Sequence, residues 1–277
     1  MALPVRPSEV TDWVRCNKLW EYKHLEGWRA PDSAWEPWQL MGSAVHAGLA
    51  AYWDAKMGRP TVPPKDEVTG EFALSWPPTA PPEFSREGLE SLALKVLDKV
   101  LAWIMVNMPD AQPVMVEQSL GADGHTTPDL VTRESIGLVV TDWKTSANLP
   151  ADKMVYRLQE IDRTWQFLHY CWAVGEHLQE PVRMFRKVVI AMGPKILVRS
   201  AEFMPTPEMI AAWHRDAEVT WDLMNKMRNG TVYPWRNENG CLKYGARYRC
   251  QYYEACWTCF GDESKMGAFL VKGEPGA

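Results

Sequence analysis

The sequence predicts a mixed α/β fold in which helices cover both faces of a central sheet. The order of its segments supports this class: helical stretches come first, three apolar stretches of strand length follow, and a helix and a returning strand come next. The composition agrees, because 46% of the 277 residues are hydrophobic and 23% are charged, which excludes global disorder. No stretch reaches the ~18 uncharged apolar residues of a membrane span.

The first half of the chain is predicted to be mainly helical. Apolar residues at helical spacing predict helices over 9–24 and 86–108, and a run of small residues predicts another over 41–56. Residues 31–40 are predicted to form a loop. Repeated Pro and Gly predict irregular structure over 57–85.

The second half alternates between strands and helices. The predicted strands contain residues 113–120, 130–132, 138–143 and 187–199, and the predicted helices contain 151–178 and 207–229. The second and third of these strands flank a short polar segment, which is typical of a β-hairpin.

The charge and the first residues limit the classes of function. The formal net charge is −5, so the chain is not a globally basic nucleic-acid coat protein, although a local basic groove could still bind phosphates. The N-terminus has no long apolar run followed by a small-residue cleavage site. The expected compartment is therefore the cytoplasm.

The predicted hairpin places two carboxylates side by side. If Asp129 opposes Asp142, residue 130 pairs with 141, and a four-residue loop remains at 134–137. Opposed side chains have Cβ atoms ~5 Å apart. Two such carboxylates repel each other unless a cation lies between them, and Mg²⁺ or Mn²⁺ prefers oxygen ligands. A surface hairpin with incidental charges is the alternative interpretation.

Lys144 adds a positively charged side chain beside this carboxylate pair. Because side chains alternate along a strand, Lys144 lies on the same face as Asp142, and Trp143 points away. A metal ion polarises a phosphoryl oxygen and lowers the pKa of a bound water. The lysine ammonium can orient that water or stabilise the developing charge.

With these residues, further motifs resemble the PD-(D/E)xK nucleases of the RecB-like exonuclease branch. Residues 42–46 resemble its G-x-x-x-H element, and Gln166 and Tyr170 resemble its Q-x-x-x-Y element. The resemblance implies that His46 joins Asp129 and Asp142 on the metal, and that Gln166 and Tyr170 position the substrate strand or the lysine. Glu117, twelve residues before Asp129, is a weaker candidate for the same groove.

The cysteines carry the other part of the resemblance. Cys16 resembles the isolated upstream cysteine of the iron–sulfur members, and Cys241, Cys250 and Cys256 resemble their C-terminal trio, which implies a 4Fe–4S cluster. Two alternatives remain: a local zinc site formed by the trio with Cys259, or no metal at all. The sixth cysteine, Cys171, lies in an apolar helical stretch and is predicted to be a buried thiol.

The resemblance covers residues 8–260 and implies a restriction-endonuclease-like core with an iron–sulfur subdomain built from both chain ends. The expected parts are a subdomain of residues 1–40 and 230–262, a nuclease core of 41–229 and a flexible tail of 263–277.

The function implied is metal-dependent DNA exonuclease activity, acting on single-stranded ends in recombination, repair or CRISPR spacer processing in a bacterial or phage-infected cell. DNA is the expected partner, together with a recombination or CRISPR protein or a second copy of the chain. Two other functions stay open: a DNA-end-binding module that assists a helicase or integrase, and a restriction-type endonuclease.

Overall fold

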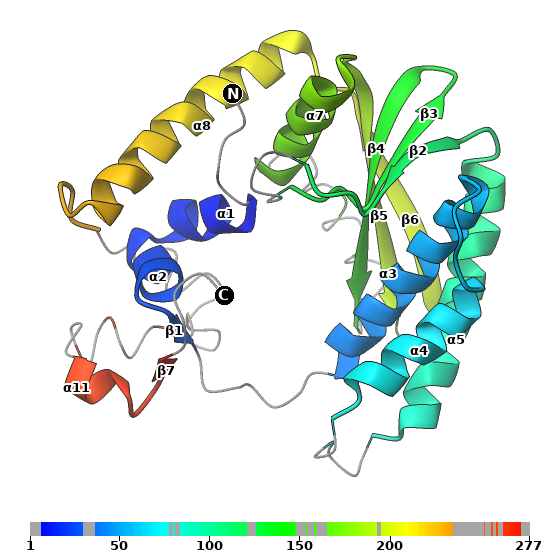
Figure 1. Ribbon diagram of the computed structural model, residues 1–277, viewed down its shortest axis with the longest axis horizontal. Helices are drawn as coiled ribbons and strands as arrows, with labels where there is room; N and C mark the ends of the chain where they lie inside the picture. Colours follow the sequence, from blue (N-terminus) through cyan, green and yellow to red (C-terminus); the bar gives the residue numbers. More distant parts are fainter. Residues whose placement is uncertain are drawn as a thin grey trace. The chain divides into compact units, whose positions relative to one another are not determined.

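The structure of the chain is a computed structural model (Figure 1). It describes residues 7–29, 37–77, 80, 84–120, 126–147, 154, 158, 165–192, 195–234, 252, 256, 259 and 263–272. The contacts divide the chain into two compact units, one formed by Leu3–Ala34 with Ala212–Ala277 and the other by Trp35–Ala211. The compact second unit ends earlier than the expected core of 41–229, because most of helix α8 (Pro207–Arg228) belongs to the first unit.

The second unit is built on a mixed sheet. In the described part of the chain this sheet has five strands in the order β2-β3-β4-β5-β6. The strands are β2 (Gln112–Val116), β3 (Leu130–Glu134), β4 (Gly137–Ser146), β5 (Val182–Met192) and β6 (Ile196–Phe203). Strands β4 and β5 are parallel, and the other neighbours are antiparallel. The predicted mixed α/β class is therefore confirmed.

The β3–β4 hairpin has the register that the sequence predicts. Leu130 pairs with Thr141 and Arg133 pairs with Leu138. The predicted four-residue loop is wrong, because Glu134 also pairs with Gly137 and only two residues remain in the turn. Gly137 has a φ of 114°, a left-handed value that glycine adopts without strain and that lets the second strand begin immediately.

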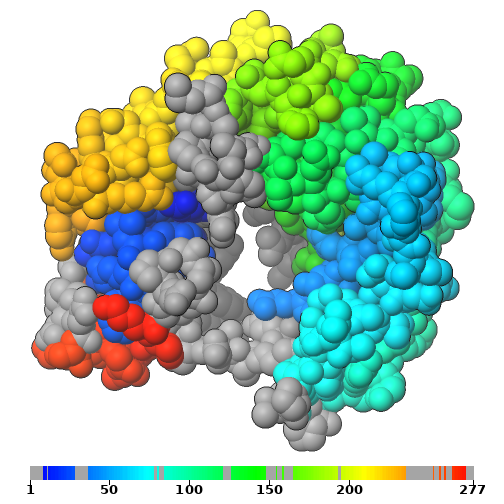
Figure 2. All heavy atoms as spheres, viewed as in Figure 1, coloured from blue at the N-terminus to red at the C-terminus, as the bar shows by residue number. Residues whose placement is uncertain are grey.

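Helices α3 (Pro37–Lys56) and α5 (Arg86–Asn107) cover one face of this sheet, and α4 (Pro64–Ser75) packs against both of them. They lie side by side in the blue and cyan part of the molecule (Figures 1 and 2). Their apolar side chains share a core with Trp143 and Val188 of the sheet. The sequence predicts α5 closely, and the Ser85 hydroxyl caps it by accepting a hydrogen bond of 2.9 Å from the Gly88 amide.

Helix α4 contradicts the irregular structure predicted for 57–85. Pro64 is its first residue, a position where proline is favourable because the missing N–H would have no partner inside the helix. Val68 and Phe72, four residues apart, bury one side of the helix in the core. The prolines that suggest a loop therefore mark the start of a helix.

The opposite face of the sheet is covered by α7 (Trp165–Leu178). Phe167 and Cys171 of this helix, which lies beside β4 in Figure 1, belong to one buried cluster with Val140 and Phe185 of the sheet. Cys171 is buried, as predicted. Most of the predicted helical stretch before residue 165 lies outside the described residues.

The first unit joins segments from both parts of the chain. Its N-terminal elements are α1 (Pro7–Arg15), α2 (Asn17–Trp20), the π-helix η1 (Glu21–Leu25) and β1 (Trp28–Arg29), and its later elements are most of α8, α11 (Glu263–Met266) and β7 (Val271–Lys272). A single helix over 9–24 is not formed, because Cys16 has extended backbone angles and interrupts it.

Strand β7 pairs with β1, with Trp28 opposite Lys272. The expected flexible tail of 263–277 therefore contains a helix and a paired strand. Met266 and Leu270 are buried in the same cluster as Trp28, which accounts for the order of this segment. No helix in the described ranges is both long and apolar enough to span a membrane.

Candidate active site

Two aspartates from the hairpin form the centre of the site. Asp129 directly precedes β3 and Asp142 lies within β4, so the hairpin register brings them to neighbouring positions. The Asp129 Oδ2 atom accepts a hydrogen bond of 2.6 Å from the Trp143 amide, which fixes this carboxylate against the partner strand. The Asp142 side chain is only 3% exposed. Both predicted carboxylates therefore lie at the same end of the hairpin.

The pKa values of these carboxyl groups report how unfavourable their charges are. Burial raises the pKa of Asp129 to about 6, although Lys144 and the Trp143 amide act in the opposite direction. Burial, with the negative charge of Asp129, also raises the pKa of Asp142 to about 6. Carboxylates in such surroundings are stabilised by any cation that binds between them.

Lys144 supplies one positive charge to the pair. Its Nζ atom lies 2.9 Å from Asp142 Oδ1, and its side chain is 42% exposed. Burial alone would lower the pKa of Lys144, but the charges of Asp142 and Asp129 outweigh burial and raise it. The amine therefore stays protonated, and it faces the same side of the sheet as Asp142, as the alternation along β4 predicts.

His46 approaches the carboxylates from α3. One turn before it, Gly42 allows this helix to come very close to the end of β4: a Cβ atom at this position would lie 2.6 Å from Thr145 Oγ1. The His46 Nδ1 atom lies 4.0 Å from Asp129 Oδ1. Burial and the charge of Lys144 lower the pKa of His46, so the neutral ring keeps a lone pair that can bind a metal.

Glu117 also belongs to this site, although the sequence singles it out only weakly. His46, Glu117 and Asp129 each offer a ligand atom, and these atoms all lie within 4.8 Å of one another. Burial and the charge of Asp129 raise the pKa of Glu117 to about 7. The pairing of Val116 with Leu130 places residue 117 opposite Asp129, but this register cannot be read from the sequence without the position of β2.

Gln166 and Tyr170 share one face of α7, as predicted. The Gln166 amide donates a hydrogen bond of 2.9 Å to the Tyr170 hydroxyl. Burial, together with the charges of Asp142 and Asp129, raises the pKa of Tyr170 to about 12, although the hydrogen bond with Gln166 acts in the opposite direction. Tyr170 is thus a neutral hydroxyl within electrostatic range of Lys144 and the carboxylates.

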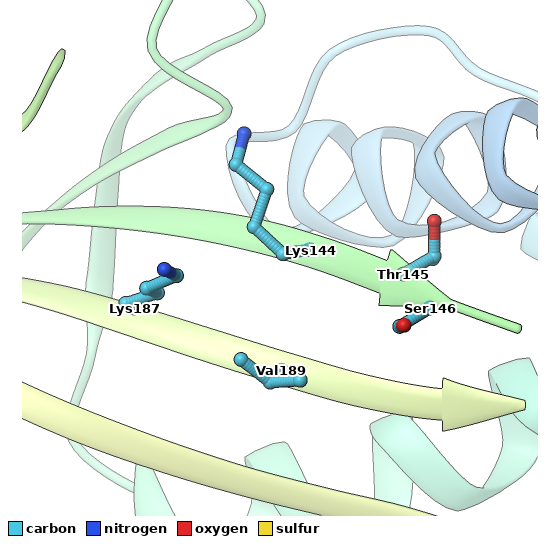
Figure 3. Close-up of a pocket in the computed structure, with 5 residues that line it drawn as sticks. All are labelled: Lys144, Thr145, Ser146, Lys187 and Val189. Atoms are coloured by element: carbon cyan, nitrogen blue, oxygen red, sulfur yellow. The ribbon is translucent and has the colours of Figure 1, made fainter. Parts of the chain in front are cut away.

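A cavity of about 180 Å³ lies beside Lys144, and Figure 3 shows residues that line it. Lys144, Thr145 and Ser146 follow one another at the end of β4, and Lys187 and Val189 lie on β5. Lys187 pairs with Asp142 in the parallel ladder, so it lies on the face of the sheet that carries the active-site side chains. Lys187 is not identified from the sequence alone.

Cys16, Cys256 and Cys259 lie in the first unit, whereas Cys171 lies in the second. Cys16, Cys256 and Cys259 are buried in one cluster that also contains Tyr22 and Tyr252. Cys241 and Cys250 lie outside the described residues. The structure therefore brings the isolated N-terminal cysteine together with two cysteines of the C-terminal region.

Known proteins resemble this chain in sequence and in structure. The sequence profile of the PD-(D/E)XK nuclease superfamily matches residues 5–257. The crystal structure of a candidate exonuclease from Eubacterium rectale is similar at 14% sequence identity, with 84% of each chain covered and a TM-score of 0.46. The comparison with curated proteins found no match.

Proposed function

The chain belongs to the PD-(D/E)XK nuclease superfamily, and from this premise we propose that it is a metal-dependent deoxyribonuclease that degrades DNA from single-stranded ends. The observation that carries the proposal is the joint placement of Asp129, Asp142 and Lys144, with His46 4.0 Å from Asp129. The choice of an exonuclease rests on the resemblance of Gln166 and Tyr170 to the Q-x-x-x-Y element of the RecB-like branch.

His46, Asp129 and Asp142 would hold a Mg²⁺ or Mn²⁺ ion. The donor set fits such an ion, because carboxylate oxygens are its preferred ligands and burial makes the unbalanced negative charges costly. When bound, the ion supplies a Lewis acid for a phosphoryl oxygen and lowers the pKa of a coordinated water.

The side chains around this position orient the substrate and stabilise charge. Lys144 remains protonated beside Asp142, so its ammonium can orient the attacking water or stabilise charge on the phosphoryl group. Tyr170, held by Gln166, can position Lys144 or the DNA strand. Lys187, on the same face of the sheet, offers a second ammonium to a neighbouring phosphate of the strand.

The first unit is proposed to hold a 4Fe–4S cluster on Cys16, Cys241, Cys250 and Cys256. The shared burial of Cys16 and Cys256 supports a site that joins the two ends of the chain. Cys259 is buried in the same cluster and could replace Cys241 as the fourth ligand. The burial of Cys16 in this cluster disfavours a zinc site built only from the C-terminal cysteines, because such a site would not require Cys16.

The proposed cellular role is DNA degradation in recombination, repair or CRISPR spacer processing in the cytoplasm of a bacterial or phage-infected cell. A recombination or CRISPR protein and a second copy of the chain remain proposed partners. A DNA-end-binding module and a restriction-type endonuclease are the competing functions.

The experiment compares end-labelled linear and circular single-stranded DNA with Mn²⁺ or Mg²⁺. Wild-type protein should degrade the linear DNA and spare the circle. Lys144→Ala should lose about a hundredfold or more of this activity, because the lost ammonium acts on the reacting phosphate. Lys195→Ala removes the same charge at an exposed residue of the β5–β6 turn and serves as the control. Cleavage of the circle would favour an endonuclease, and DNA binding without hydrolysis would favour the end-binding module.

A further inference from the structure

Glu117 stands in an unusual backbone conformation directly after β2. Its φ angle is 44°, in the left-handed region that few residues other than glycine adopt. Its amide donates a hydrogen bond of 3.2 Å to the Asp129 carbonyl, so this conformation is tied to the neighbouring active-site residue. Strain of this kind persists where the surrounding structure imposes it, and it is concentrated at functional sites.

This conformation brings the Glu117 carboxylate to the imidazole and carboxylate already assigned to the metal. Its Oε1 atom lies 4.0 Å from His46 Nδ1, the same distance that separates that nitrogen from Asp129 Oδ1. Ligand atoms on one octahedral Mg²⁺ or Mn²⁺ ion are roughly 3 to 4 Å apart, because each lies about 2.1 Å from the ion. The three atoms, all within 4.8 Å of one another, need only small side-chain adjustments to share an ion.

Asp142 is placed differently. Its Oδ1 atom lies 2.9 Å from the Lys144 ammonium, and its side chain is almost fully buried. Lys144 thus already balances part of its charge. The Glu117 side chain is 40% exposed, so its carboxylate borders the open side of the site, from which an ion would enter.

We propose that Glu117 is a ligand of the catalytic ion, and that His46, Glu117 and Asp129 bind this ion before DNA arrives. The inference rests on the proposed function, because it concerns the same metal-dependent site. It adds a ligand from the residue that follows β2 to those from α3 and the hairpin. It also implies that the ion binds in a step separate from binding of the substrate.

The test measures Mn²⁺ binding to the full chain without DNA, by titration calorimetry and by the electron paramagnetic resonance of free Mn²⁺. Glu117→Gln keeps the shape of the side chain and should weaken Mn²⁺ affinity at least about tenfold, since even partners outside the coordination shell commonly contribute that much. Asp110→Asn removes the same charge from an exposed residue in the turn before β2, and it should leave Mn²⁺ affinity unchanged.

Glu117→Gly separates a ligand role from a structural one. Glycine adopts a φ of 44° without strain, so this variant should unfold at the same or a higher temperature in chelator and still lose Mn²⁺ affinity. Both results together support the proposal.

Two outcomes would overturn it. If Glu117→Gln binds Mn²⁺ as tightly as wild type while wild type degrades DNA, Glu117 is not a ligand and the nuclease proposal stands. If wild type binds no Mn²⁺ until DNA is added, loading before the substrate is wrong. A failure of the proposed function is distinguishable, because wild-type protein would then hydrolyse no DNA with any divalent ion.

Discussion

At the scale of single residues, the site combines carboxyl groups that destabilise the folded chain with a lysine that relieves part of their repulsion. Asp129 and Asp142 both have a pKa of about 6 because they are buried. Lys144 forms an ion pair with Asp142. One ammonium group does not balance the three neighbouring carboxylates of Glu117, Asp129 and Asp142. The site is therefore arranged for a further cation at a cost in stability when that cation is absent.

The raised pKa of Asp142 predicts that the free energy of unfolding depends on pH. The pKa of Asp142 is about 6 in the folded chain against an ordinary value of 3.8, so between these values the folded state binds more protons than the unfolded state. The free energy of unfolding should therefore fall as pH rises from about 4 to about 6. Asp142→Asn removes this contribution and should be more stable than wild type by about 1–3 kcal/mol at pH 8 in chelator.

The measurement is urea unfolding of both proteins from pH 8 down to about pH 3, with chelator present. The difference should shrink toward zero below about pH 3, where the carboxyl is protonated in both states. A difference that stays constant with pH would show that the effect does not arise from ionisation of Asp142.

The sequence predicts these residues unequally. The spacing of Asp129, Asp142 and Lys144 is sufficient, because alternation along a strand and the pairing register of the hairpin determine which side chains share a face. Glu117 is identified only weakly, since its placement depends on a left-handed backbone angle and on the register of a third strand. Lys187 is missed because its position depends on a parallel pairing between strands far apart in the sequence.

At the scale of elements, the position of α3 depends on the absence of a side chain at Gly42. An alanine Cβ atom there would lie 2.6 Å from Thr145 Oγ1, so Gly42→Ala should push α3 away from β4 and move His46 with it. DNA hydrolysis should fall at least about tenfold, because displacements of about 1 Å in an active site can cost a hundredfold.

The double variant Gly42→Ala with Thr145→Ala should recover much of this loss. Removing the hydroxyl leaves the Thr145 Cβ atom, 3.7 Å away, as the nearest neighbour. Gly70→Ala in α4 is the control, since nothing lies within 4 Å of its added Cβ atom. Hydrolysis of end-labelled DNA is measured for all variants, and a double variant no more active than Gly42→Ala would contradict the steric explanation.

The elements themselves were predictable where periodicity dominates. The uninterrupted apolar spacing of α5 indicates that helix correctly. Helix α4 is missed because prolines at 63 and 64 suggest a loop, although Pro64 occupies a first-turn position. The interruption at Cys16 is missed because nothing in the local pattern requires an extended residue between two helical turns.

At the scale of the whole molecule, substitution of single cysteines tests whether the N-terminal and C-terminal segments bind one iron–sulfur cluster together. Cys16→Ser and Cys256→Ser should both lose bound iron and unfold at a lower temperature, because binding of a cluster contributes to folding. Cys171→Ser, in the core of the other unit, should keep its iron. Iron content and thermal unfolding are measured on protein purified without oxygen.

Cys259→Ser distinguishes the ligand sets. It should keep its iron if Cys241 completes the cluster, and lose it if Cys259 does. A protein that contains zinc, tolerates loss of Cys16 and requires Cys259 would contradict the iron–sulfur proposal altogether.

The pairing of β1 with β7 has a consequence for synthesis on the ribosome. The hydrogen bond from the Tyr252 hydroxyl to the Trp28 carbonyl joins residues 224 positions apart, and the first unit contains both. At about 5 to 20 residues per second, the N-terminal segment waits roughly 10 to 45 s for these partners to emerge. The continuous stretch Trp35–Ala211 can fold during that interval. The first segment to be translated is therefore among the last to reach its native contacts, and its apolar residues, Leu19, Tyr22 and Trp28, are the ones that a chaperone would have to shield in the nascent chain.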